Sequence, residues 1–187
     1  MIYAEEPMNT SPTPWSLNCE HSSIEFKVRH LMLSKVVGCF RRFEGKLLWR
    51  PESPSNASAS ASIQVASIDT RDSSRDRHLV GPDFFDASRY PQISFSSTRF
   101  TPETKTSFSL EGDLSMHGVT KSVVLHCSGI KIKESASSQN SKLSLIATTK
   151  ILRKDYGLMW NAAIEAGGVL VGDEIEIRLE LGFDQMK

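Results

Sequence analysis

Residues 174–183 read EIEIRLELGF, and this stretch decides the fold class. Apolar side chains stand at every second position from Ile175 to Phe183, and charged side chains occupy the positions between them as far as Glu180. Such alternation is typical of a β-strand with one buried face and one face in water. The same pattern recurs in shorter form at residues 24–29, 108–116 and 143–151.

About eight or nine such segments follow one another, joined mostly by short turns and without long helical periods, which predicts an all-β antiparallel fold. A sandwich and a barrel fit this pattern equally well. We favour a barrel because closure of about eight strands removes both sheet edges and leaves room for one small ligand. The predicted fold is a single antiparallel eight-stranded β-barrel. The domain is expected over residues 15–187, after a flexible, proline-containing N-terminal tail over residues 1–14.

One stretch interrupts the alternation. Residues 69–91 read DTRDSSRDRHLVGPDFFDASRYP and combine dense charge with apolar bulk. Ser73 or Ser74 is predicted to cap a short helix that ends at Gly81-Pro82, and Pro82 suits the first turn of a second helix. This helical insert is expected to cover one end of the barrel. The side chains that it would turn inward are Leu79, Phe84 and Phe85.

Composition and spacing argue against several classes of function. The chain carries 22 basic and 22 acidic residues, so its formal net charge is zero, and nucleic acid is not an expected partner. The five histidines show no H-x-H or H-E-x-x-H spacing, so no metal site is expected. The absence of a G-x-S-x-G motif argues against nucleophilic catalysis.

The compartment is predicted from the N-terminus. No apolar run approaches the ~18 residues of a membrane-spanning helix, so no integral membrane segment is expected. Residues 1–7 show neither the basic nor the apolar region of a signal peptide, which predicts a cytoplasmic protein for the chain as written. A processed form would begin in the same way, and the periplasm is therefore the alternative.

Several short motifs occur in a fixed order. The early ones are His21-Ser22, Val28-Arg29-His30, Gly38 and Phe40. The central ones are Asp69-Thr70, Arg75–Leu79, Asp83-Phe84-Phe85 and Tyr90-Pro91. The later ones are Gly112-Asp113-Leu114, His117–Thr120, Arg153–Leu158 and Val171-Gly172-Asp173. In this order, from about Trp15 to Phe183, they resemble the YceI-like domain.

The resemblance implies a lipocalin-like extended β-barrel whose interior binds a long apolar chain. In this family the ligand is typically a polyisoprenoid, such as an isoprenoid quinone or a polyprenyl phosphate, or a fatty amide. Members are bacterial and many are periplasmic. This chain departs from the family in two respects, since it shows no export signal and has Lys154 beside Arg153 where serine is frequent.

We therefore expect a protein that is not an enzyme and that carries or sequesters such a lipid, with no cofactor besides the bound lipid. Each buried methylene contributes ~0.8 kcal/mol, so about ten of them give roughly micromolar affinity. The pattern alone favours a packed core over a hollow one, and the resemblance reverses this preference. The residues predicted to line the interior are Phe26, Val28, Phe40, Phe43, Leu79, Phe84, Phe85, Phe95, Leu114, Met116 and Ile151.

Four basic or neutral nitrogen-bearing side chains are candidates for holding a polar head group. Arginine offers a planar donor fork suited to phosphate or carbonyl oxygens, and neutral histidine donates one hydrogen bond. The alternative is structural, with Arg75 and Asp76 tying the insert down by salt bridges. The four head-group candidates are His30, Arg75, His78 and His117.

Two rival functions stay open. One is an enzyme acting on an isoprenoid lipid, with His78, His117 or Asp76 as acid or base. The other is a stress-response protein whose barrel is packed and holds no ligand. The oligomeric state is open as well, with a homodimer among the options.

Overall fold

A computed structural model of the chain describes residues 13–30, 34–49, 57–134, 141–162 and 170–186. Eight strands form a closed antiparallel β-barrel, as the sequence predicts. Each strand of the ring pairs with the next in the order given below, and β11 pairs with β1 to close it. The strands are β1 (Pro14–Leu17), β4 (Phe43–Leu48), β5 (Ser58–Gln64), β7 (Gln92–Pro102), β8 (Ser107–Met116), β9 (Val119–Lys133), β10 (Lys142–Leu152) and β11 (Val171–Gln185).

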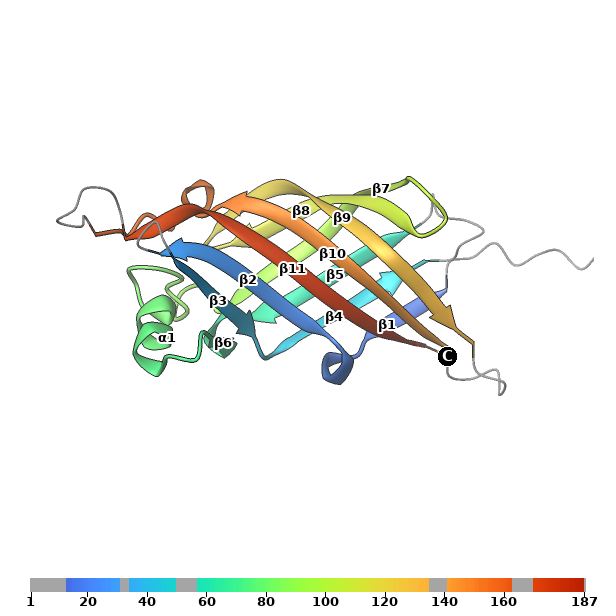
Figure 1. The fold of residues 1–187 in the computed structure, drawn as a ribbon, viewed down its shortest axis with the longest axis horizontal. Helices are drawn as coiled ribbons and strands as arrows, with labels where there is room; N and C mark the ends of the chain where they lie inside the picture. The colour runs from blue at the N-terminus through green and yellow to red at the C-terminus, as the bar shows by residue number, and fades with distance from the viewer. Residues whose placement is uncertain (1–12, 31–33, 50–56, 135–140, 163–169, 187) are drawn as a thin grey trace, which may run out of the picture.

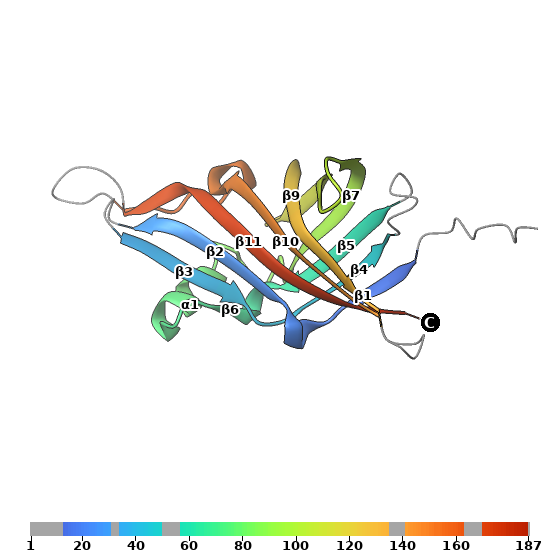
Figure 2. The same ribbon diagram turned by 45° about the vertical axis from the view of Figure 1, so that its right-hand side comes forward.

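Further strands continue the wall at one end of the barrel. The long β11 pairs with β2 (Ser23–His30) along its first half and with β1 at its last residues. Next to β2 lies β3 (Ser34–Phe40), which pairs at its end with the short β6 (Ile68–Asp69). Helix α1 (Ser73–Val80) lies beside β3 and β6, at the end opposite the C-terminus (Figure 1 and Figure 2). The short 3₁₀ helices are η1 (Cys19–His21), η3 (Val65–Ser67) and η4 (Arg153–Tyr156).

Two glycines make room for aromatic rings inside the barrel. A Cβ atom at Gly38 would lie 2.3 Å from the Phe26 ring, and one at Gly112 would lie 2.4 Å from the Phe95 ring. Side chains do not approach one another so closely, so only glycine lets these rings lie flat across the neighbouring strand.

Buried side chains form two clusters. The closed end, where β1 completes the ring, contains Trp15, Phe108, Leu143 and their neighbours. Cys127 lies in this cluster, and burial raises the pKa of its thiol to about 12. The other end lies beside the insert of residues 69–91, which we call the lid, and is named the lid end. It contains Phe40, Val65, Ile68, Met116 and Tyr156 among others, and α1 packs against it through Leu79 and Val80.

The N-terminus of α1 differs from the prediction. Its cap is Asp72, whose carboxylate accepts the backbone N–H groups of Ser74 and Arg75, so the serine caps predicted at positions 73 and 74 are wrong. A carboxylate at this position also faces the positive end of the helix dipole, which a serine hydroxyl exploits less well.

The predicted second helix is also wrong. Residues 81–90 form turns, because the amide of Phe85 donates to the carbonyl of Leu79 and the amide of Ala87 to that of Val80. These bonds fold the chain back onto the last turn of α1 instead of continuing a helical ladder. At the N-terminus, the predicted tail lies outside the described residues as far as residue 12, and Pro14 already pairs with Leu48.

Candidate functional site

A cavity of about 240 Å³ lies inside the barrel. Its wall includes members of both buried clusters, and all five apolar positions of β11 from Ile175 to Phe183 contribute to it. Pockets for drug-sized ligands span about 300–1,000 Å³, so this volume suits a narrow chain better than a bulky molecule. The wall is almost wholly apolar. Its charged members are Glu25, Lys46 and Arg153.

The wall contains all but one of the residues predicted to line it. The exception is Phe43, which is buried in the lid-end cluster at the first position of β4 and is not part of the wall. A role of the others in ligand binding stays a prediction. Those that line the cavity are Phe26, Val28, Phe40, Leu79, Phe84, Phe85, Phe95, Leu114, Met116 and Ile151.

Aromatic contacts hold the lid over this cavity. The His78 ring packs edge-on against Phe84 and Trp160, with ring centroids 5.1 and 4.7 Å apart. Phe84 and Trp160 also contact each other at 5.2 Å, and Phe85 contacts Phe40 of the wall at 6.1 Å. Trp160, which was not predicted as a site residue from the sequence, therefore joins the segment after η4 to the lid.

Arg75 is not part of the cavity wall. Its Nε donates to the Thr70 hydroxyl and its Nη2 to the Thr70 carbonyl, both at 2.8 Å. The Asp76 carboxylate accepts the Thr70 N–H at 2.9 Å and its hydroxyl at 2.6 Å. Arg75 and Asp76 thus hold the start of the insert through Thr70, which is buried. Arg75 also forms an ion pair with Asp72, with its Nη1 3.9 Å from the carboxylate, in agreement with the structural alternative.

The histidine candidates do not meet at one place either. His117 lies with its Nδ1 3.0 Å from the Tyr156 carbonyl, and its ring packs against Tyr90 with centroids 4.9 Å apart. His30 is the last residue of β2. Together with His78 in the lid, these side chains occupy three separate positions outside the cavity wall, so the structure assembles no head-group site from the four predicted residues.

Arg153 belongs to the motif of residues 153–158, but no role was predicted for it from the sequence. Its side chain is 3% exposed and lies in the cavity wall. Its guanidinium donates to four carbonyls and one carboxylate, those of Gly172 (3.0 Å), Leu158 (2.5 Å), Trp160 (2.8 Å), Val171 (3.4 Å) and Asp173 (3.1 Å). Since arginine has five N–H donors, none is left for a ligand.

Lys154, expected to add positive charge at the entrance, has a partner of its own. Its Nζ lies 2.8 Å from the second carboxylate oxygen of Asp173. Arg153 and Lys154 therefore share one carboxylate at the start of β11, and they fasten the lid end of that strand rather than offer a free cationic site.

Neither a metal cluster nor a membrane-spanning helix is found among the described residues. No group of three or more His, Cys, Asp or Glu side chains among them is arranged to hold a metal ion. Within the same ranges, no helix has the length and apolar character needed to cross a membrane.

Comparisons with known proteins agree with this architecture. The model of the YceI-like domain family matches residues 15–183. A Staphylococcus aureus (strain N315) relative, UPF0312 protein SA2479, is 31% identical over 171 residues, which cover 91% of this chain and 97% of the relative.

Solved structures show the same fold. Burkholderia cenocepacia BcnA superposes with a TM-score of 0.76 at 21% identity, covering 89% of this chain and 98% of BcnA. A polyisoprenoid binding domain from Saccharophagus degradans, implicated in plant cell wall breakdown, gives a TM-score of 0.64 at 14% identity and covers 92% of this chain and 98% of that domain.

Proposed function

The chain belongs to the YceI-like domain family, and we propose that it binds one long-chain lipid of the polyisoprenoid type inside its barrel and so carries or sequesters it. The observation that carries this proposal is the apolar cavity of about 240 Å³, whose wall reaches the lid residues Leu79, Phe84 and Phe85. The name of the Saccharophagus degradans neighbour, a polyisoprenoid binding domain, supports this ligand class.

A narrow apolar cavity is sufficient for such binding. Each methylene transferred from water contributes ~0.8 kcal/mol, so about ten give about 8 kcal/mol, or roughly micromolar affinity before the cost of ordering the chain. This transfer free energy requires no specific polar contact between the ligand and the protein. A ligand that is mostly hydrocarbon therefore suits the wall better than a polar metabolite.

The contacts of the acid–base candidates support binding over catalysis. The Asp76 carboxylate accepts two hydrogen bonds from Thr70, His117 lies against the Tyr156 carbonyl, and His78 lies within the aromatic contacts of the lid. None of the three belongs to the cavity wall. A general acid or base must lie within hydrogen-bond reach of the group that it serves.

Titration of delipidated protein with geranylgeraniol tests the proposal. We expect roughly micromolar binding, and at least a tenfold loss in Phe84→Asp, because a carboxylate at this buried wall position is costly to desolvate. Leu48→Asp, an equivalent change at an exposed position of β4, is the control and should bind as the unaltered protein does. Equal binding by the two variants, with unchanged far-UV circular dichroism, would contradict the assignment of the cavity.

A further inference from the structure

The barrel wall is split between β9 and β10. The two strands pair from Lys133 with Lys142 to His126 with Thr148, and the pairing ends there. Beyond this point residues 119–125 of β9 still pair with β8, and residues 149–152 of β10 still pair with β11. In the described part of the chain, no pairing joins these two segments to each other. We call this opening the β9–β10 rift.

Exposure along β10 changes where the rift begins. The inward-facing Leu143 and Ala147 are each 1% exposed, whereas Thr149 and Ile151, which follow them on the same face, are only half-buried. On the other side of the rift, Val123 is likewise half-buried. These half-buried residues line the internal cavity at the place where β9 and β10 are not paired.

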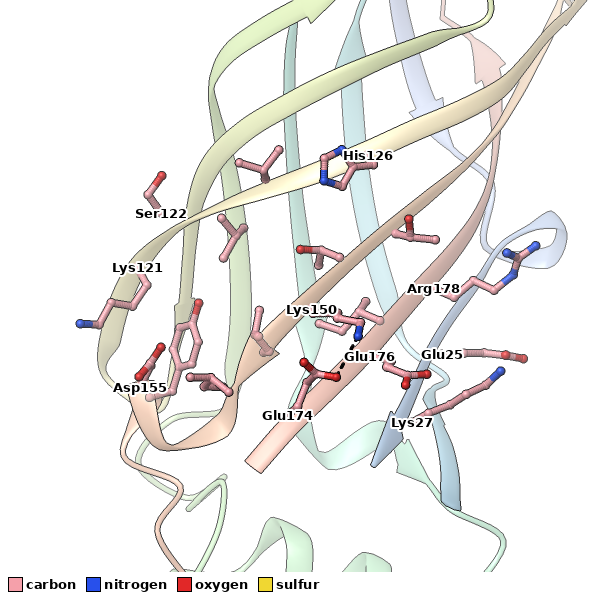
Figure 3. Close-up of a pocket in the computed structure, with 18 residues that line it drawn as sticks. Glu25, Lys27, Lys121, Ser122, His126, Lys150, Asp155, Glu174, Glu176 and Arg178 are labelled. Atoms are coloured by element: carbon pink, nitrogen blue, oxygen red, sulfur yellow. Dashed lines mark hydrogen bonds and ion pairs between the residues drawn. The ribbon is translucent and has the colours of Figure 1, made fainter. Parts of the chain in front are cut away.

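A groove of about 820 Å³ runs along the outside of the rift (Figure 3). Val123, Thr149 and Ile151 line both this groove and the internal cavity. One layer of side chains thus separates the two spaces, and the movement of these side chains would connect them. That movement would give a chain in the cavity a route to the surface that does not pass the lid.

Tyr156 provides an unused hydrogen-bond donor on this groove. It lines the groove at the end of η4 and is 1% exposed, yet its hydroxyl has no hydrogen-bond partner among the described residues. Burial also raises the pKa of this hydroxyl to about 12, so it keeps its proton at neutral pH. Buried hydroxyls are normally paired, and an unpaired one at a groove indicates a place for a ligand atom.

The charges of the groove indicate whether this ligand atom is charged or neutral. Its wall contains four cationic side chains (Lys27, Lys121, Lys150 and Arg178) and as many carboxylates. Within it, the Lys150 ammonium lies 2.9 Å from the Glu174 carboxylate. Figure 3 marks this ion pair with a dashed line and shows Lys121 on the same side of the groove as Asp155. Such a balance gives no net attraction for a phosphate, which requires an excess of cationic donors.

We propose that the β9–β10 rift is a second part of the binding site, in which the Tyr156 hydroxyl donates a hydrogen bond to an uncharged oxygen, of the carbonyl type, at the polar end of the bound chain. This inference rests on the proposed function, because the chain itself lies in the barrel. It assigns the polar end to the side of the barrel and not to the lid, and it favours neutral amphiphiles over phosphorylated ones.

The test compares three ligands with the same geranylgeranyl chain, ending in a methyl ketone, in a phosphate, or in no polar group, each competing with a fluorescent prenyl probe. In Tyr156→Phe the affinity for the ketone should fall about three- to tenfold, as expected for one lost hydrogen bond, while that for the hydrocarbon stays unchanged. The unaltered protein should bind the phosphate no more tightly than the ketone. Tyr90→Phe, which removes a hydroxyl outside the groove, should leave all three affinities unchanged.

The outcomes separate this inference from the proposed function. Loss of an unpaired buried hydroxyl does not destabilise a fold, so Tyr156→Phe should unfold at the same urea concentration or a higher one. If the ligands bind but Tyr156→Phe weakens ketone and hydrocarbon equally or not at all, the rift assignment is overturned and the barrel site stands. Phosphate binding ten times tighter than ketone binding would also overturn it. If no ligand binds the unaltered protein, the proposed function itself fails.

Discussion

Strand β10 crosses two different regions of the same wall. In its first half, Leu143, Leu145 and Ala147 are buried in the closed-end cluster, and β9 pairs with their strand. In its second half, Thr149 and Ile151 continue the same alternation, but they line the cavity and have no β9 residue paired across from them. One amphipathic pattern thus produces a packed wall or an open one, depending on the neighbouring strand.

The largest effect that this comparison predicts concerns core truncation. Leu143→Ala should lower the free energy of unfolding by about 4 kcal/mol, because it opens a void in a packed region. Ile151→Ala should cost only about 1 kcal/mol, because its side chain already borders a cavity and is half-buried. Urea unfolding of delipidated protein measures both. Similar losses for the two variants would show that the two halves of β10 are packed alike.

A second, smaller effect concerns the fastening of the lid end. Arg153→Gln should lower the free energy of unfolding by about 3 kcal/mol, because it leaves several buried carbonyl groups without their donors. Lys154→Gln is the matched control and should cost less than about 1 kcal/mol, since its ion pair with Asp173 is exposed to solvent. The urea midpoints of the two variants show which residue contributes more to stability. An Arg153 variant as stable as the Lys154 variant would refute the structural role of Arg153.

The smallest effect is a local one in acid. Asp69 and Asp72 lie just before α1, and each carboxylate accepts a hydrogen bond from a backbone amide. The donor is the amide of Arg71 for Asp69 and the amide of Arg75 for Asp72, and these bonds lower the pKa values of both carboxyl groups. A lowered pKa in the folded state means that the stabilisation is present above pH ~4, the value for unfolded aspartate, and is lost as the pH falls further.

Amide exchange measures this effect. Between pH 5 and pH 3, protection factors in α1 should fall while those of residues 142–148 of β10 stay constant. A uniform fall across both segments would indicate that acid weakens the whole barrel and not the lid.

Alternation was sufficient to predict an antiparallel all-β fold, because it depends only on which face of each strand is buried. The choice of a barrel over a sandwich rested on the closure of the sheet edges and on the family resemblance. The five apolar residues at alternate positions from Ile175 to Phe183 all line the interior, as their spacing predicts. Most of the predicted apolar wall follows from the same rule. Phe43 departs from it, since its side chain is buried in the lid-end cluster and does not line the cavity.

The polar part of the site was not predictable in this way. Arg75 has the chemistry of a head-group ligand, but Thr70, five residues before it, accepts hydrogen bonds from its Nε and Nη2. The β9–β10 rift was not predicted from the sequence, since Thr149 and Ile151 continue the alternation of the paired half of β10. Hydrogen-bond partners of this kind depend on register and tertiary contacts, which residue patterns do not specify.

The central claim is that the barrel encloses an apolar cavity that holds a lipid chain. Native mass spectrometry of the freshly purified protein, before and after organic extraction, tests it most directly. We predict a one-to-one adduct of a long-chain lipid that extraction removes and that Phe84→Asp fails to retain. A bare protein mass in every sample, together with no uptake of added prenyl lipid after extraction, would contradict the claim.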